Sequence, residues 1–134
     1  MDSNPTWPPR AAAIVALLYG VFLLLGGNGH LQAVLPMLRE GAGDNFLFLP
    51  AAILMGAGLV HIVLAPWLWT GRRAACVAAT VTAFAVGNYL IYLLVTGVPD
   101  HPLAVFSVLT WAWFAGVLWM AVSQYRAPAT EAVA

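Results

Sequence analysis

The sequence contains very little charge: 7% of its 134 residues are Asp, Glu, Lys or Arg, and no lysine is present. An ordinary soluble domain carries about 25% charged residues. Five Arg residues balance five acidic residues, so the formal net charge is zero. The scarcity of charge excludes a soluble globular domain, and the even balance argues against a nucleic-acid partner, which requires a basic surface.

Cysteine is nearly absent as well, because Cys76 is the only one and lies inside an apolar run. A single cysteine excludes an intramolecular disulfide and any site built from several cysteines, such as an iron–sulfur cluster. The sequence also lacks G-x-S-x-G, H-E-x-x-H and Glu-x-x-His spacings, which removes the usual serine-hydrolase and helical metal-site signatures.

Apolar residues, by contrast, make up 63% of the chain. A helix needs about 20 of them in succession to cross a hydrocarbon layer of about 30 Å. Four uncharged runs approach or exceed that length, at residues 11–27, 46–70, 74–96 and 103–123. They predict an all-α integral membrane protein, an up-down-up-down four-helix transmembrane bundle between terminal tails 1–10 and 124–134. The first run also fits the apolar region of a cleaved signal peptide.

The distribution of arginine predicts the orientation of this bundle. Arg10, Arg72, Arg73 and Arg126 fall on one side of a four-span topology, and Arg39 falls on the other. Positively charged loops stay in the cytoplasm. We therefore expect a multi-pass inner (plasma) membrane protein with both termini in the cytoplasm.

The longest connection, residues 28–45, contains two patterns that bear on its structure. The glycine-rich residues 26–29 are typical of a turn and are expected to end the first span. Residues 31–38 are apolar, so a short separate helix on the membrane surface is expected there.

Small residues recur at every fourth position in two of the spans. Helices in lipid associate where small side chains let their backbones approach. The stripes are Ala75, Ala79, Ala83 and Gly87 in the third run, and Ala12, Ala16 and Gly20 in the first. They predict packing seams that either hold the bundle together or form a contact with a protein partner or a second copy.

One readily titratable residue, His61, lies near the middle of a span. An ionisable group within the membrane is a candidate functional residue, because burying one is costly. Asn88 and Tyr92 share one face of the third run, so His61, Asn88 and Tyr92 are candidates for binding a cofactor or ligand. The alternative is a structural role in which a neutral ring of His61 is satisfied by hydrogen bonds.

Most of the remaining titratable residues gather on the outer side of the predicted topology. Histidines and carboxylates are suitable for acid/base catalysis or for binding a divalent metal ion. The candidates for such a site are His30, Glu40, Asp44, Asp100 and His101. No spacing among them enforces a site, and the alternative is that they are solvated loop residues.

Three short segments resemble a known group of membrane proteins. They are Gly-Gly-Asn-Gly-His-Leu at 26–31, Gly-Ala-Gly-Leu at 56–59 and Gly-Arg-Arg-Ala-Ala at 71–75. Over about residues 11–96 the chain is similar to the DoxX-like family of small four-span proteins, with His30 where that family usually has Lys. The resemblance implies a membrane subunit associated with quinone-linked or redox complexes, and it assigns no catalytic residue and no cofactor.

These observations favour an accessory or anchoring subunit of a membrane complex, or a homo-oligomer. A second hypothesis is a membrane-embedded enzyme that acts on a quinone, isoprenoid or sterol with the outer-side histidines and carboxylates. A third is a transporter of a small solute that uses His61 as its proton site.

Overall fold

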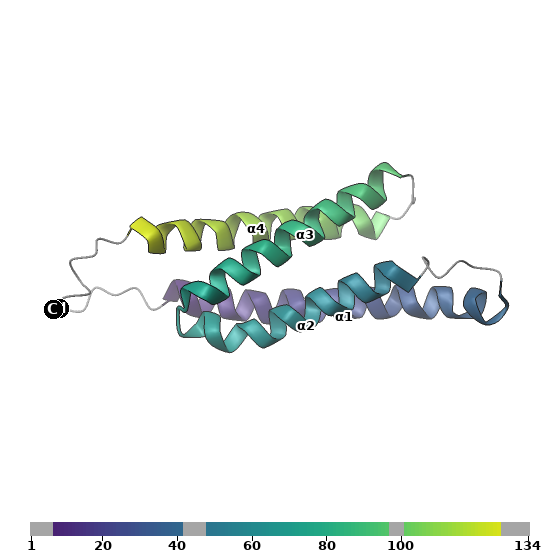
Figure 1. Ribbon diagram of the computed structural model, residues 1–134, viewed down its shortest axis with the longest axis horizontal. Helices are drawn as coiled ribbons and strands as arrows, with labels where there is room; N and C mark the ends of the chain where they lie inside the picture. Colours follow the sequence, from purple (N-terminus) through teal and green to yellow (C-terminus); the bar gives the residue numbers. More distant parts are fainter. Residues whose placement is uncertain (1–6, 42–47, 97–100, 127–134) are drawn as a thin grey trace.

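A computed structural model of the chain describes residues 7–41, 48–96 and 101–126. This part of the chain folds into helices only: α1 (Trp7–Arg39), α2 (Leu49–Trp69), α3 (Arg73–Val95) and α4 (His101–Arg126) (Figure 1). Each helix is long and apolar enough to cross a membrane. The prediction of an all-α, multi-pass membrane protein with an up-down-up-down bundle is confirmed.

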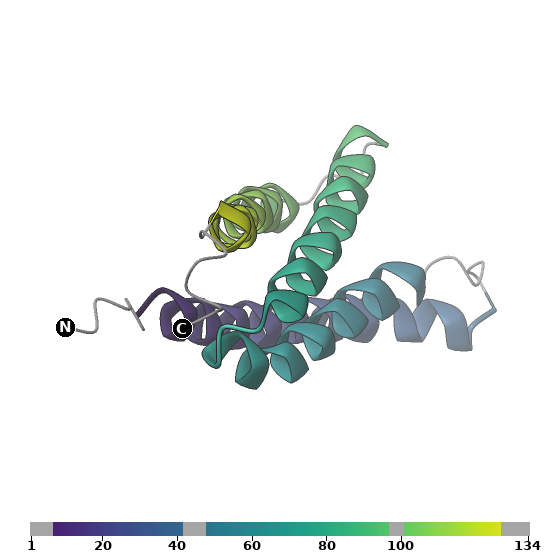
Figure 2. The same ribbon diagram turned by 60° about the vertical axis from the view of Figure 1, so that its left-hand side comes forward.

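The helices are arranged as two antiparallel hairpins, α1 with α2 and α3 with α4 (Figure 1). Contacts between α2 and α3 join the hairpins. The second view shows that α3 is inclined away from the layer formed by α1 and α2 (Figure 2). The α2–α3 turn is short because Gly71 adopts a φ of 70°, a left-handed conformation that glycine tolerates. The beginning of α1 and the end of α4 consequently lie at the same end of the bundle (Figure 1).

The predicted turn at residues 26–29 is wrong, because α1 continues through them to Arg39. These glycines permit close packing instead of a turn. A Cβ atom on Gly27 would lie 2.5 Å from Cγ of Met55, and one on Gly26 would lie 2.6 Å from the Phe106 ring. The expected separate helix at 31–38 is likewise part of α1. The left-handed glycine comes only afterwards, at Gly41 with a φ of 67°.

Both predicted stripes of small residues pack inside the chain. Each of their members is buried: Ala75, Ala79, Ala83, Gly87, Ala12, Ala16 and Gly20. At the crossing of α1 and α2, a Cβ atom on Gly20 would lie 2.7 Å from the carbonyl oxygen of Gly58. The stripes therefore hold the bundle together, and a contact with another protein would have to use a different surface.

The end of the bundle that carries the start of α1 and the end of α4 also carries a set of arginine contacts. The guanidinium of Arg10 lies 5.3 Å from the centre of the Trp69 ring, a favourable cation–π arrangement. Nη2 of Arg73 donates to the Gln124 carbonyl at 2.9 Å, and Nε2 of Gln124 donates to the Gly71 carbonyl at 3.2 Å. These contacts connect the ends of the four helices to one another.

Candidate functional site

The centre of the bundle contains one fully buried histidine, His61 on α2. Its Nδ1 atom lies 2.8 Å from the carbonyl oxygen of Ala57, one turn earlier. Because a carbonyl oxygen only accepts, Nδ1 carries the ring hydrogen and Nε2 presents a lone pair. Nε2 is buried and has no hydrogen-bond partner among the described residues.

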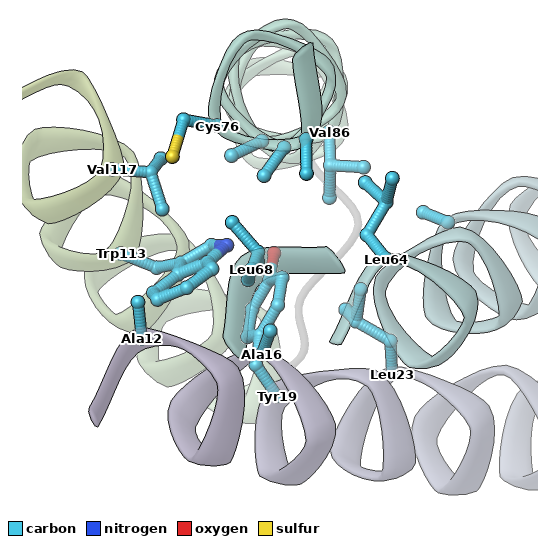
Figure 3. Packing of buried hydrophobic residues seen from close by; sticks show 14 of the residues in the cluster. Ala12, Ala16, Tyr19, Leu23, Leu64, Leu68, Cys76, Val86, Trp113 and Val117 are labelled. Carbon is cyan, nitrogen blue, oxygen red and sulfur yellow. The ribbon is translucent and has the colours of Figure 1, made fainter. Parts of the chain in front are cut away.

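Two aromatic rings from other helices pack against His61. Tyr19 of α1 meets it edge-on, with ring centroids 4.9 Å apart and planes at 82°. The ring centroid of Trp113 on α4 lies 6.0 Å from that of His61. The buried Nε1 atom of Trp113 also has no hydrogen-bond partner in the part of the chain described. Figure 3 shows the Tyr19 hydroxyl and the Trp113 indole nitrogen directed into the space between the helices.

A hydrogen bond between hydroxyl groups joins this cluster across the two hairpins. The Tyr19 hydroxyl and Oγ1 of Thr110 on α4 are 2.7 Å apart and buried. A buried hydroxyl is costly when it is left without a partner. The pair therefore fixes both side chains, and with them the rotation of α1 relative to α4.

A groove of about 840 Å³ lies between α1 and α4, next to this cluster. Its α1 wall extends from Pro8 to Phe22, a distance of about 21 Å at 1.5 Å per residue. The opposite wall includes Leu109, Gly116 and Trp119 of α4. The groove thus begins near one membrane surface and ends close to the stacked rings of Phe22 and Phe106, whose centroids are 4.1 Å apart.

Tyr19 and Trp113 belong both to the wall of the groove and to the cluster around His61. His61 lies directly behind these two rings. Ligand pockets in proteins measure about 300–1,000 Å³ and are mostly apolar with a few polar groups. The groove has the size and composition of a site for a lipophilic molecule.

Of the outer-side candidates, only His30 and Glu40 have described side chains. His30 lies half-buried on α1, and Glu40 lies exposed just beyond the end of that helix. Ten residues separate them, which corresponds to about 15 Å along a helix. Asp44 and Asp100 lie outside the described residues, and of His101 only the backbone, at the start of α4, is described. Within the described ranges no three His, Cys, Asp or Glu side chains form a group suited to a metal ion.

The structure does not group Asn88 and Tyr92 with His61. Both are exposed on α3, Tyr92 to 61%. Nδ2 of Asn88 donates to the carbonyl of Phe84 at 2.8 Å, within its own helix. The residues that do surround His61 are Tyr19 and Trp113. Counting residues along antiparallel helices gives Tyr19 and Trp113 about the same depth in the bundle as His61. The sequence does not show, however, which way each helix is rotated about its axis, and so whether these side chains face His61.

Comparison with protein-family models, curated proteins and solved structures gives no match to this chain. The DoxX-like resemblance therefore rests on the three sequence segments alone and stays a prediction. One of those segments, residues 26–31, lies within α1.

Proposed function

We propose that this small multi-pass membrane protein binds a lipophilic molecule in the groove between α1 and α4. The observation that carries the proposal is the groove itself, about 840 Å³ in volume, with Tyr19 and Trp113 in its wall. Its walls are apolar along α1 and α4, and the lining residues with a side-chain nitrogen or oxygen atom are Tyr19, Trp113, Trp119 and Ser123. That combination is typical of small-molecule sites.

The size of the groove favours a small molecule over a helix of another protein. A helix with side chains is about 10–12 Å across, so a 21 Å length of helix occupies roughly 1,600–2,400 Å³. The groove holds about 840 Å³, so a partner helix would insert one face only. A quinone, an isoprenoid or a sterol is closer in size to the space between the helices.

Two glycines provide a matched test. Gly116 lines the groove, whereas Gly56 lies on the exposed face of α2, and a Cβ atom on either would meet nothing within 4 Å. Gly116→Leu places a branched side chain at the groove, with open space at its Cβ position, and Gly56→Leu makes the same chemical change elsewhere. We expect native mass spectrometry of the gently extracted protein to detect a bound small molecule in the wild type and in Gly56→Leu. We expect the molecule to be lost in Gly116→Leu, and equal retention in both variants would contradict the proposal.

The enzyme hypothesis shares this binding site, since the bound molecule would be its substrate. Its proposed chemistry lies at the outer side, at His30, Glu40, Asp44, Asp100 and His101, of which only His30 and Glu40 have described side chains. The binding proposal requires no reaction. The transporter hypothesis also involves this cluster, because its proton site is His61, and it would require pH-dependent flux in proteoliposomes that is lost in His61→Ala.

We also propose, as a second possible role, an accessory or anchoring subunit of a membrane complex, as the DoxX-like resemblance implies. The observation that favours it is an outward pair of small residues on α2: Ala52 and Gly56 are four positions apart and exposed. Such pairs allow another helix to approach closely. In a Cys76→Ala background, Gly56→Cys should crosslink to a neighbouring protein in native membranes, and Gly29→Cys on α1 is the exposed control. Equal crosslinking of the two would argue against this surface.

A further inference from the structure

Behind the wall of the groove lie a hydrogen-bond acceptor and a hydrogen-bond donor that are both without a partner. The acceptor is Nε2 of His61, because Nδ1 of that ring is engaged with the Ala57 carbonyl. The donor is the Nε1–H group of Trp113. The two rings are neighbours, with centroids 6.0 Å apart.

Unpartnered polar groups in a core require an explanation. Among the described residues Nε1 of Trp111 and Oε1 of Gln124 are also buried without a partner, but the acceptor of His61 and the donor of Trp113 belong to neighbouring rings beside the groove. The neighbouring Tyr19 and Thr110 hydroxyls are hydrogen-bonded to each other at 2.7 Å, so other polar groups of the same cluster do have partners. His61 is fully buried and Trp113 is 8% exposed. Water from the membrane surface does not reach this depth freely, so a group brought by a ligand is the natural partner.

We infer that the molecule bound in the groove carries a hydroxyl group, as a long-chain alcohol or phenol does, and that this group lies between His61 and Trp113. The inference rests on the proposed function. A hydroxyl oxygen accepts a hydrogen bond from Nε1–H of Trp113, and its hydrogen is donated to Nε2 of His61. A ketone or quinone carbonyl satisfies Trp113 only, and an ether likewise offers no hydrogen to His61. Both nitrogens are buried, so the hydroxyl reaches this position only when the rings of Tyr19 and Trp113, whose centroids are 6.1 Å apart, separate.

The experiment compares farnesol with farnesyl methyl ether, which share a chain and differ in the hydroxyl hydrogen. Binding of each to the purified, detergent-solubilised protein is measured by competition with tritiated farnesol. We expect farnesol to bind roughly tenfold more tightly than the ether, the usual effect of one buried hydrogen bond. His61→Leu should abolish that preference, because His61 accepts the hydrogen that only the alcohol offers. Trp113→Phe should weaken both compounds alike, and Gly56→Leu on the exposed face of α2 should change neither affinity.

Each other outcome counts against a defined part of the argument. Equal affinity for alcohol and ether overturns the hydroxyl inference and leaves the groove as a binding site. A preference that survives His61→Leu overturns it too. If Gly116→Leu fails to weaken either compound, or the wild type binds neither, the proposed function fails together with the inference. Trp113→Phe is a second test that keeps an aromatic ring at its site, and unchanged binding of both compounds in this variant would contradict a hydroxyl placed at Trp113.

Discussion

The hydroxyl groups of Tyr19 and Thr110 are 2.7 Å apart and connect α1 to α4, and therefore one hairpin to the other. The groove lies between these two helices, so their backbones do not pack closely along it. Side-chain contacts therefore contribute much of what keeps α1 and α4 in position. Hydrogen bonds between helices in membranes contribute about 0.6 kcal/mol on average and up to about 1.7 kcal/mol.

Tyr19→Phe and Thr110→Val should each destabilise the protein by about 1 kcal/mol. Each removes one hydroxyl of the pair and leaves the other buried without its partner. In the double variant the losses should not add, since the same hydrogen bond is removed. Unfolding in mixed detergent with increasing dodecyl sulfate measures all four proteins. Fully additive losses would mean that the two hydroxyls do not interact.

Gly20→Ala and Gly58→Ala should destabilise the protein by roughly 1–3 kcal/mol, the usual effect of overpacking. A Cβ atom on Gly58 would lie 2.6 Å from the carbonyl oxygen of Gly20, so α1 and α2 would have to separate. Gly56→Ala, two positions earlier on α2, is the control because nothing lies within 4 Å of its Cβ position. Thermal stability is measured by size-exclusion chromatography of heated samples. It should fall for Gly20→Ala and Gly58→Ala and stay unchanged for Gly56→Ala.

Gly29→Ala tests the continuity of α1. Gly29 is exposed inside the helix and has open space around it, so alanine should stabilise the protein by up to about 1 kcal/mol through its higher helix propensity. In a turn with a left-handed glycine the same substitution would be destabilising. A lowered unfolding midpoint for Gly29→Ala would therefore favour a helix that ends at residues 26–29.

Reporter fusions test the orientation, which we propose to have both termini in the cytoplasm. Arg10, Arg72 and Arg73 lie at the end of the bundle where α1 and α3 begin, and loop arginines favour the cytoplasm. Fluorescent protein fused to either terminus should fluoresce in a bacterial host, and alkaline phosphatase fused there should be inactive. The reverse pattern at both termini would invert the proposed topology.

The spans were predictable because lipid imposes one strong rule, a long uncharged run with every backbone group paired inside a helix. The turn at residues 71–73 followed from its length alone. Residues 26–29 were misassigned because glycine serves both turns and close helix contacts, and the contacts of Gly26 and Gly27 are with Phe106 and Met55 from distant parts of the chain.

The site was predictable only in part. His61 was evident as the one readily titratable residue in mid-membrane, but its neighbours depend on how each helix is rotated about its axis. Counting residues gives depth and not rotation, so Asn88 was considered as a partner although it is exposed on α3 and bonds to Phe84. Tyr19 and Trp113 carry no sequence pattern that distinguishes them from other aromatic residues of the spans.

The contact between Gly20 and Gly58 also has a consequence for biosynthesis. This close approach of two backbones lies within the first hairpin, and both of its glycines have been synthesised once α2 ends at Trp69. The first two helices can therefore pair in the membrane while α3 and α4 are still to be translated. We expect the second hairpin to dock onto this pair afterwards, which would make the groove a seam between two parts inserted one after the other.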